Sequence, residues 1–178
     1  GEGTAVAPYL ISNASELYLL ANSDRETTLG KYYKLTNDIA ISNVYDNWEN
    51  ENPYSWTKQK ALLDGFAYTS SFAGVLDGAG YTVSGLYCED AITDNGTYAY
   101  GLIPYATASA IIRNLNVENV NINVTGNAYA GAVGGAAHVS GDDAENPLKY
   151  VNFVDVNVSD CDITATNSSE ILGGATRG

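Results

Sequence analysis

Few residues in this sequence could perform acid–base or nucleophilic chemistry. His138 is the only histidine among 178 residues, and no serine or cysteine nucleophile motif lies beside it. A catalytic base needs a partner within hydrogen-bond reach, so we interpret His138 as a turn or surface residue. Cys88 and Cys161 form no metal motif and lie in runs of alternating apolar residues, where a thiol packs as a small hydrophobe. We expect both thiols to be buried and unpaired.

The carboxylates also lack the pattern of an active site. Asp155, Asp160 and Asp162 lie close together, but the aligned positions of the preceding repeat, described below, hold asparagines that cannot act as acid or nucleophile. No column of basic residues aligns with Arg113, as an uronate lyase would require. We therefore predict that the protein is not an enzyme and has no catalytic residue. A polysaccharide lyase or hydrolase-like protein with an incomplete or lost active site is the alternative function.

Two kinds of binding site are candidates. Aromatic rings stack on sugar C–H faces, and the group Trp48, Tyr54 and Trp56 stands among asparagine and glutamate residues that could bond sugar hydroxyls. The alternative for the tryptophans is packing against the fold. A second, weaker glycan-binding group is Tyr98, Tyr100 and Tyr105.

A calcium site is the one candidate metal centre. Asp142, Asp143 and Glu145 supply carboxylate oxygens, which calcium prefers, but their spacing matches no EF-hand, and a solvated acidic loop is the alternative. Asp77-Gly78-Ala79-Gly80 resembles a calcium turn, and a tight corner explains it equally well. We expect no required cofactor, with calcium as the option.

The charge balance excludes several partners. The chain carries 21 acidic and 8 basic residues, a net charge of −13, which repels nucleic acid and anionic lipid headgroups. No apolar run is long enough to insert into a membrane. An extracellular ligand, either a polysaccharide or another protein, is the partner that we expect.

The N-terminal segment, residues 1–30, has the pattern of a strand followed by a helix. Pro8 to Ile11 form a short apolar run, and Asn13 with Glu16 makes a capping box. The stripe Leu17, Leu20 and Ala21 predicts a helix from Ala14 to about Asn22 that covers the end of a stack of strands. Residues 31–71 then hold short extended pieces and a long aromatic insertion over 43–66.

From residue 72 to 178 the sequence repeats itself. Val83–Cys88 aligns with Ile112–Val117 at an offset of 29 residues, and that segment aligns with Phe153–Val158 at an offset of 41. Strands of three to five residues are stable only when stacked, and the corners need Gly, Asn or Asp. We predict an all-β fold, a right-handed parallel β-helix with Leu86, Leu115 and Val156 in one column; an antiparallel sandwich is the alternative.

At these repeats the sequence resembles the GLUG-motif family of bacterial surface proteins. The resemblance rests on Tyr9–Ala14, Tyr33–Ile39, Phe72–Val83, and the turn Tyr100-Gly101-Leu102-Ile103 with Ile112 to Leu115. It implies a secreted or cell-surface adhesion or scaffold module that presents a rigid face, or a structural spacer. We expect residues 1–178 to be one β-helix domain, a piece of a longer protein, whose open C-terminal end could self-associate.

Overall fold

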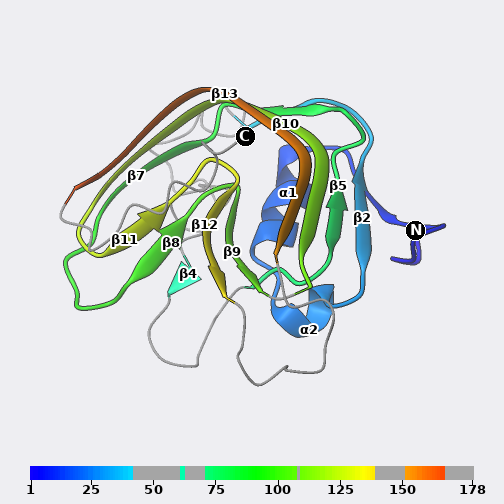
Figure 1. Cartoon of the computed structure of the whole chain (residues 1–178), viewed down its shortest axis with the longest axis horizontal. Coiled ribbons are helices and arrows are strands. Elements are labelled where there is room, and N and C mark those ends of the chain that lie inside the picture. Colours follow the sequence, from blue (N-terminus) through cyan, green and yellow to red (C-terminus); the bar gives the residue numbers. More distant parts are fainter. Residues whose placement is uncertain (42–60, 63–70, 108, 139–150, 167–178) are drawn as a thin grey trace.

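The computed structural model describes residues 1–41, 61–62, 71–107, 109–138 and 151–166. Short strands dominate it (Figure 1). In chain order the elements are β1 (Tyr9–Ile11), α1 (Ala14–Ala21), α2 (Arg25–Thr28), β2 (Tyr32–Leu35), β3 (Ile39–Ala40), β4 (Ala61–Leu62), β5 (Val75–Asp77), β6 (Thr82–Ser84), β7 (Tyr87–Ala91), β8 (Tyr98–Tyr100), β9 (Ile103–Thr107), β10 (Ile111–Thr125), β11 (Ala128–Ala130), β12 (Gly134–His138) and β13 (Asn152–Thr166). No helix in these ranges combines the length and apolar character needed to cross a membrane.

Parallel pairing joins nearly all of these strands. The long strand β10 pairs in parallel with β5, β6 and β7 on one side and with β13 on the other. Two smaller sheets repeat the arrangement, because β11 pairs in parallel with β8 and β12 with β9. Within the described strands only the β4–β8 pair is antiparallel. The prediction of an all-β fold with parallel strands is confirmed, and an antiparallel sandwich is excluded.

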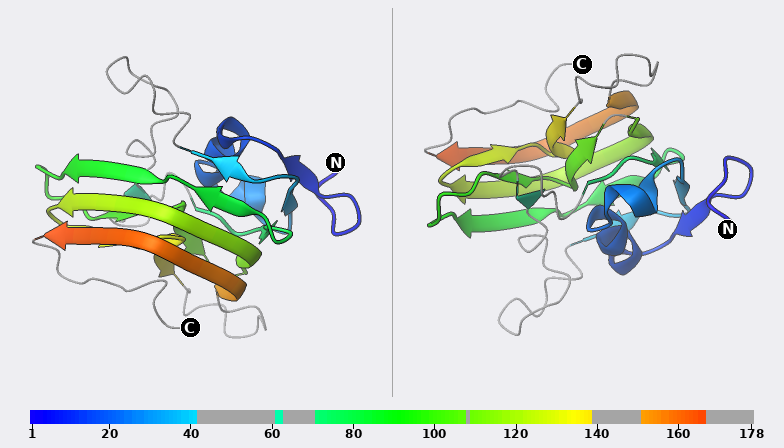
Figure 2. Two further views of the ribbon diagram at one scale, coloured as in Figure 1. Left: turned by 90° about the horizontal axis from the view of Figure 1, so that it is seen from above. Right: turned by 90° about the horizontal axis from the view of Figure 1, so that it is seen from below.

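Successive passes of the chain along the large sheet lie one beside the next, and we call each pass a rung. Residues 75–91 form one rung, β10 the next and β13 the last that the structure describes (Figure 2). Equivalent apolar residues of neighbouring rungs form inward columns. One such column runs from Ile39 through Val83 and Val117 to Val158. The first three of these side chains are buried, so the columns make the core.

Left-handed residues bend each rung at two matching places. Asn119 and Asp160 lie opposite each other with φ of 54° and 52°, and Gly85 beside them has φ of 79°. Asn114 and Asp155 form a second such pair, with φ of 50° and 53°. Asparagine, aspartate and glycine reach this conformation most easily, which explains why these residue types recur at the corners.

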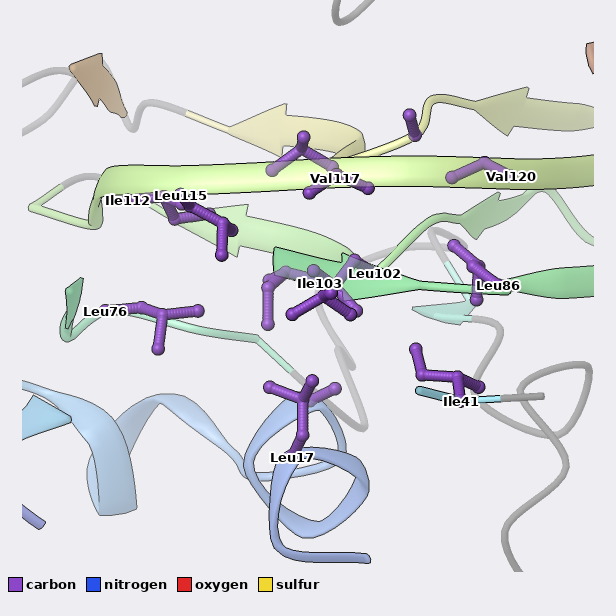
Figure 3. Close-up of a cluster of buried hydrophobic side chains, with 14 of the residues drawn as sticks. Leu17, Ile41, Leu76, Leu86, Leu102, Ile103, Ile112, Leu115, Val117 and Val120 are labelled. Carbon is purple, nitrogen blue, oxygen red and sulfur yellow. The ribbon is translucent and has the colours of Figure 1, made fainter. Parts of the chain in front are cut away.

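Helix α1 covers the end of the stack opposite to β13, as predicted (Figure 2). Its N-cap Asn13 accepts a hydrogen bond from the Glu16 N–H at 3.0 Å. Glu16 bonds back to the Ser12 N–H at 2.6 Å, one residue before the position that a capping box uses. The buried residue Leu17 points toward Leu102 and Ile103 in the core (Figure 3). The helix therefore supplies the apolar surface that closes this end.

The predicted offset between the first two repeats is wrong by five residues. Val83 lies opposite Val117 instead of Ile112, and Leu86 lies beside Val120 instead of Leu115. The offset of 41 is confirmed, because Leu115 pairs with Val156. The error has a physical cause: left-handed residues recur five positions apart within one rung, so the two registers match the same residue types. Backbone pairing of the preceding strand, β5, selects the longer offset.

Asn119 provides a test of the left-handed corners. Its side chain is exposed, so a substitution there changes backbone strain more than burial. We expect Asn119→Val to lower the free energy of unfolding by about 2 kcal/mol, because a β-branched residue is strained at positive φ. Asn119→Gly should change it by less than about 1 kcal/mol. Chemical denaturation of both variants measures the difference, and equal losses would contradict the corner assignment.

Candidate ligand-binding face

The outward side chains of β6, β7, β10 and β13 form one polar surface, which we call the polar face. Because the register is parallel, like positions of adjacent strands align about 4.8 Å apart. Four columns result: Thr82–Asn116–Asn157, Ser84–Glu118–Ser159, Tyr87–Asn121–Asp162 and Glu89–Asn123–Thr164. The face thus offers amides, hydroxyls and carboxylates in regular rows, on a scaffold of continuous strands.

Hydrogen bonds between rungs hold part of this face in place. The Asn157 side-chain N–H donates to the Asn116 side-chain oxygen at 3.0 Å, and the Asn116 amide donates to the Gly80 carbonyl at 2.8 Å. Such amide rows fix the side-chain positions before a ligand arrives, which reduces the entropy lost on binding. The amides of Asn121 and Asn123 and the carboxylate of Asp162 are exposed and stand in the adjoining columns.

Tyr87 is the aromatic residue of the polar face. Its ring is half-buried, and its hydroxyl donates to the Glu89 carboxylate at 2.5 Å. That bond raises the pKa of Tyr87, because ionisation of the phenol would remove the donated proton, and burial adds a smaller effect. The ring therefore stays neutral and fixed in orientation beside Asn121 and Asn123. An aromatic ring beside amides and carboxylates is the combination that sugars require.

The tyrosines that the sequence suggested as a second glycan patch lie elsewhere. Tyr100 and Tyr105 are only 1% and 4% exposed, so neither ring offers a face to a sugar, and that assignment is corrected for both. Tyr98 is half-buried, and its hydroxyl donates to Asp94 at 2.7 Å. These residues belong to β8 and β9, whose apolar neighbours draw the rings into the fold. Trp48, Tyr54 and Trp56 lie outside the described residues.

Tyr100 illustrates why a tyrosine in this region packs inward. Its hydroxyl donates to the Asp90 carboxylate at 2.8 Å, so the polar end of the ring is satisfied inside the protein. Burial, followed by this hydrogen bond to Asp90, raises the pKa of Tyr100 far above its usual range. Tyr100 therefore acts as a neutral core residue.

The acidic residues of the described ranges form no metal centre. No group of three or more His, Cys, Asp or Glu residues there is placed to hold an ion. Asp77, at the start of the calcium-like turn, accepts hydrogen bonds from the Ala79 N–H at 2.9 Å and the Asn114 amide at 3.1 Å, and pairs with Arg113 at 2.9 Å. Although burial opposes it, these donors hold the pKa of Asp77 below its ordinary value. Asp142, Asp143 and Glu145 lie outside the described residues.

The two cysteines are free but differ in exposure. Cys88 is buried, as predicted, and burial raises its pKa to about 12. Cys161 is exposed, which contradicts the prediction. It occupies an inward column opposite the buried residue Val120, but it lies on β13, where no further described strand covers it. The sequence pattern gave its direction correctly and could not reveal that its rung is the last.

Thiol chemistry should separate these two cysteines. At pH 8 we expect an aromatic disulfide reagent to modify one thiol, Cys161, in the folded protein. Cys88 should react only after unfolding, because it is shielded and protonated. Counting released chromophore before and after addition of denaturant measures both, and Cys161→Ser should remove the fast reaction. Two fast thiols in the folded wild-type protein would contradict the burial of Cys88.

Sequence comparison gives one informative relative. The chain is 30% identical over 138 residues to halomucin of Haloquadratum walsbyi, and the match covers 78% of this chain and 1% of that protein. The chain thus spans about 1% of the length of this relative. No family model matches the sequence, and no solved structure matches it. The similarity is to a short segment of a very long protein.

Proposed function

We propose that this chain is a non-catalytic extracellular or cell-surface module that binds carbohydrate through its polar face. The observation that carries the proposal is the placement of the Tyr87 ring beside exposed amide and carboxylate columns on three successive rungs. Sugars present alternating C–H faces and hydroxyls, and this face offers a partner for each. A repeating ligand such as a polysaccharide suits the repeating side chains of the rungs.

The proposed scaffold is a right-handed parallel β-helix of the GLUG-motif type. Parallel rungs with matched corners support this winding, since crossover connections between parallel strands are almost always right-handed. The motifs Phe72–Val83 and Tyr100–Ile103 support the family. In this winding the polar face is one flat side, and its rigidity comes from the column packing behind it.

The proposed location is extracellular. The net charge of −13 supports a soluble, self-repelling module, and the similarity to halomucin supports a cell-surface setting. The adhesion or scaffold role follows from a ligand-binding face without catalytic groups. It is a proposal about this module and leaves the activity of any longer protein open.

A polysaccharide array followed by calorimetry tests the proposal. We expect the wild-type protein to bind at least one polysaccharide without cleaving it, and Tyr87→Ala to weaken that binding at least tenfold. Tyr81→Ala is the matched control, because Tyr81 is exposed but outside the four columns. It should bind like the wild type.

Three results would contradict the proposal. Binding lost in Trp48→Ala or Trp56→Ala but kept in Tyr87→Ala would move the site to the aromatic segment. Release of shortened sugars would indicate an enzyme. Absence of binding to every polysaccharide on the array would favour a structural spacer.

A further inference from the structure

The outer edge of β13 lacks the neighbour that every inner rung has. Among the described residues β13 pairs only with β10. The Asn152 N–H donates to the Ala110 carbonyl, and the Thr166 carbonyl accepts from the Gly126 N–H, both at 2.9 Å, so these groups face β10. Residues alternate in this respect along a strand of a parallel sheet. The backbone groups of Phe153 and Ala165 therefore face the free edge.

The inward side chains of β13 are also incompletely covered. Phe153 continues the column of Leu76 and Ile112, which are both 0% exposed, yet Phe153 is 47% exposed. Val158 and Ile163 likewise continue buried columns and are only partly buried. The core thus ends with an apolar surface that one more rung would cover.

The corners of β13 specify the shape of an incoming strand. Asp155 and Asp160 have φ of 53° and 52°, directly opposite Asn114 and Asn119 of β10. A strand that follows β13 in parallel must bend at the same two places, five residues apart. It therefore needs residues that tolerate the left-handed conformation there, as β10 has.

Charge at this edge specifies the residue types further. The exposed residues Asp155, Asp160 and Asp162 lie where β10 has Asn114, Asn119 and Asn121. Within the stack, an asparagine above an aspartate is a bonded pair, since the Asn114 amide donates to the Asp77 carboxylate at 3.1 Å. A strand with asparagine at the three positions would supply the same donors to the three aspartates of β13.

From this register, burial and charge pattern we propose that the free edge of β13 binds a parallel strand of the β10 type. Such a strand carries apolar residues inward, left-handed asparagines at both corners, and amides facing Asp155, Asp160 and Asp162. The partner is thus another rung of the same repeat, and the β10–β13 interface continues through it. This inference is independent of the ligand of the polar face.

A second copy of β13 matches this edge poorly. In parallel register it would set each of the three aspartates beside an identical one, and like charges directly opposite destabilise a sheet. In an antiparallel twofold pairing, the corners coincide only when Asn157 lies opposite Val158. One of these side chains is outward and the other inward, so the two faces of the sheet would be exchanged.

Peptide binding to the full chain tests the proposal. The probe is a labelled peptide with the β10 sequence, Ile111–Thr125, and the readout is fluorescence anisotropy with hydrogen exchange of the protein. We expect saturable binding at one peptide per protein and slower exchange at the Phe153 and Ala165 amides. A peptide carrying Asn114→Val and Asn119→Val should bind at least tenfold more weakly, because valine resists the corner conformation. A peptide with the β13 sequence should also bind at least tenfold more weakly.

A change in the protein separates edge binding from other contacts. Ala165→Pro removes an edge-facing N–H without removing a bond to β10, so it should abolish peptide binding while circular dichroism shows a folded protein. No binding of the β10 peptide up to its solubility limit would overturn the proposal, as would equal binding of the valine peptide. A protein dimer in sedimentation equilibrium that Ala165→Pro dissociates would overturn it in favour of a second copy.

Discussion

Gly135→Ala is expected to lower the free energy of unfolding by about 3 kcal/mol, at the upper end of the usual cost of overpacking. A Cβ atom at Gly135 would lie 2.5 Å from both the backbone nitrogen and the carbonyl oxygen of Tyr100, and 2.9 Å from the Pro104 carbonyl oxygen. Backbone atoms cannot rotate away as the end of a side chain can. The turn between β8 and β9 would have to move away from β12, which would separate two stacked rungs. Urea denaturation measures the loss.

The adjacent glycine is the matched control. A Cβ atom at Gly134 would meet the Phe153 ring at 3.5 Å and the Ile103 carbonyl at 3.8 Å, which are ordinary contacts. Gly134→Ala should therefore change the free energy of unfolding by less than about 1 kcal/mol. If the two variants were equally stable, the close approach of the β8–β9 and β11–β12 turns would be refuted.

Leu115→Ala should cost about 4 kcal/mol. Leu115 is 0% exposed and lies in the centre of the inward surface of β10, near Leu102, Ile103 and Ile112 (Figure 3). Truncation would leave a cavity between rungs, and buried leucine-to-alanine changes cost about 2–5 kcal/mol. Strands on both sides hold the backbone of β10, so the cavity has little scope to collapse. Thermal and urea denaturation provide the measurement.

A matched pair of valines shows how the cost depends on rung position. Val117 and Val158 lie in one column, but Val117 is 1% exposed while Val158 on β13 is only partly buried. Val117→Ala should cost about 2.5 kcal/mol, and Val158→Ala about 1 kcal/mol, because less apolar area is lost from the core. Equal costs would mean that β13 is covered as fully as β10.

The local features of the fold were predictable from the sequence because they depend on neighbouring residues. Asn13, Glu16 and the stripe through Leu17 are enough to define helix α1, and the alternation in β10 defines its inward side. The register between rungs was harder, because corners recur within one rung at five-residue spacing. Asn114 and Asn119 therefore match Gly85 equally well in sequence. Only pairing between distant segments distinguishes the two alignments.

The candidate site was less predictable for a related reason. Tyr87 and Tyr100 both follow small or apolar residues, and nothing local marks the first as part of a surface and the second as buried. The outward position of Tyr87 becomes clear only through its alignment with Asn121 and Asp162, which needs the correct register. With the offset of 34 residues in hand, the amide columns beside Tyr87 could have been found in the sequence.

Long-range nuclear Overhauser effects across β10 test the parallel stack most directly. Uniformly labelled protein should show backbone contacts from Val117 to both Val83 and Val158, and from Ile122 to both Cys88 and Ile163, in the pattern of parallel strands. Contacts from Val83 to Ile112, or the close Hα–Hα contacts of antiparallel pairs across β10, would contradict the stacked arrangement and the polar face built on it.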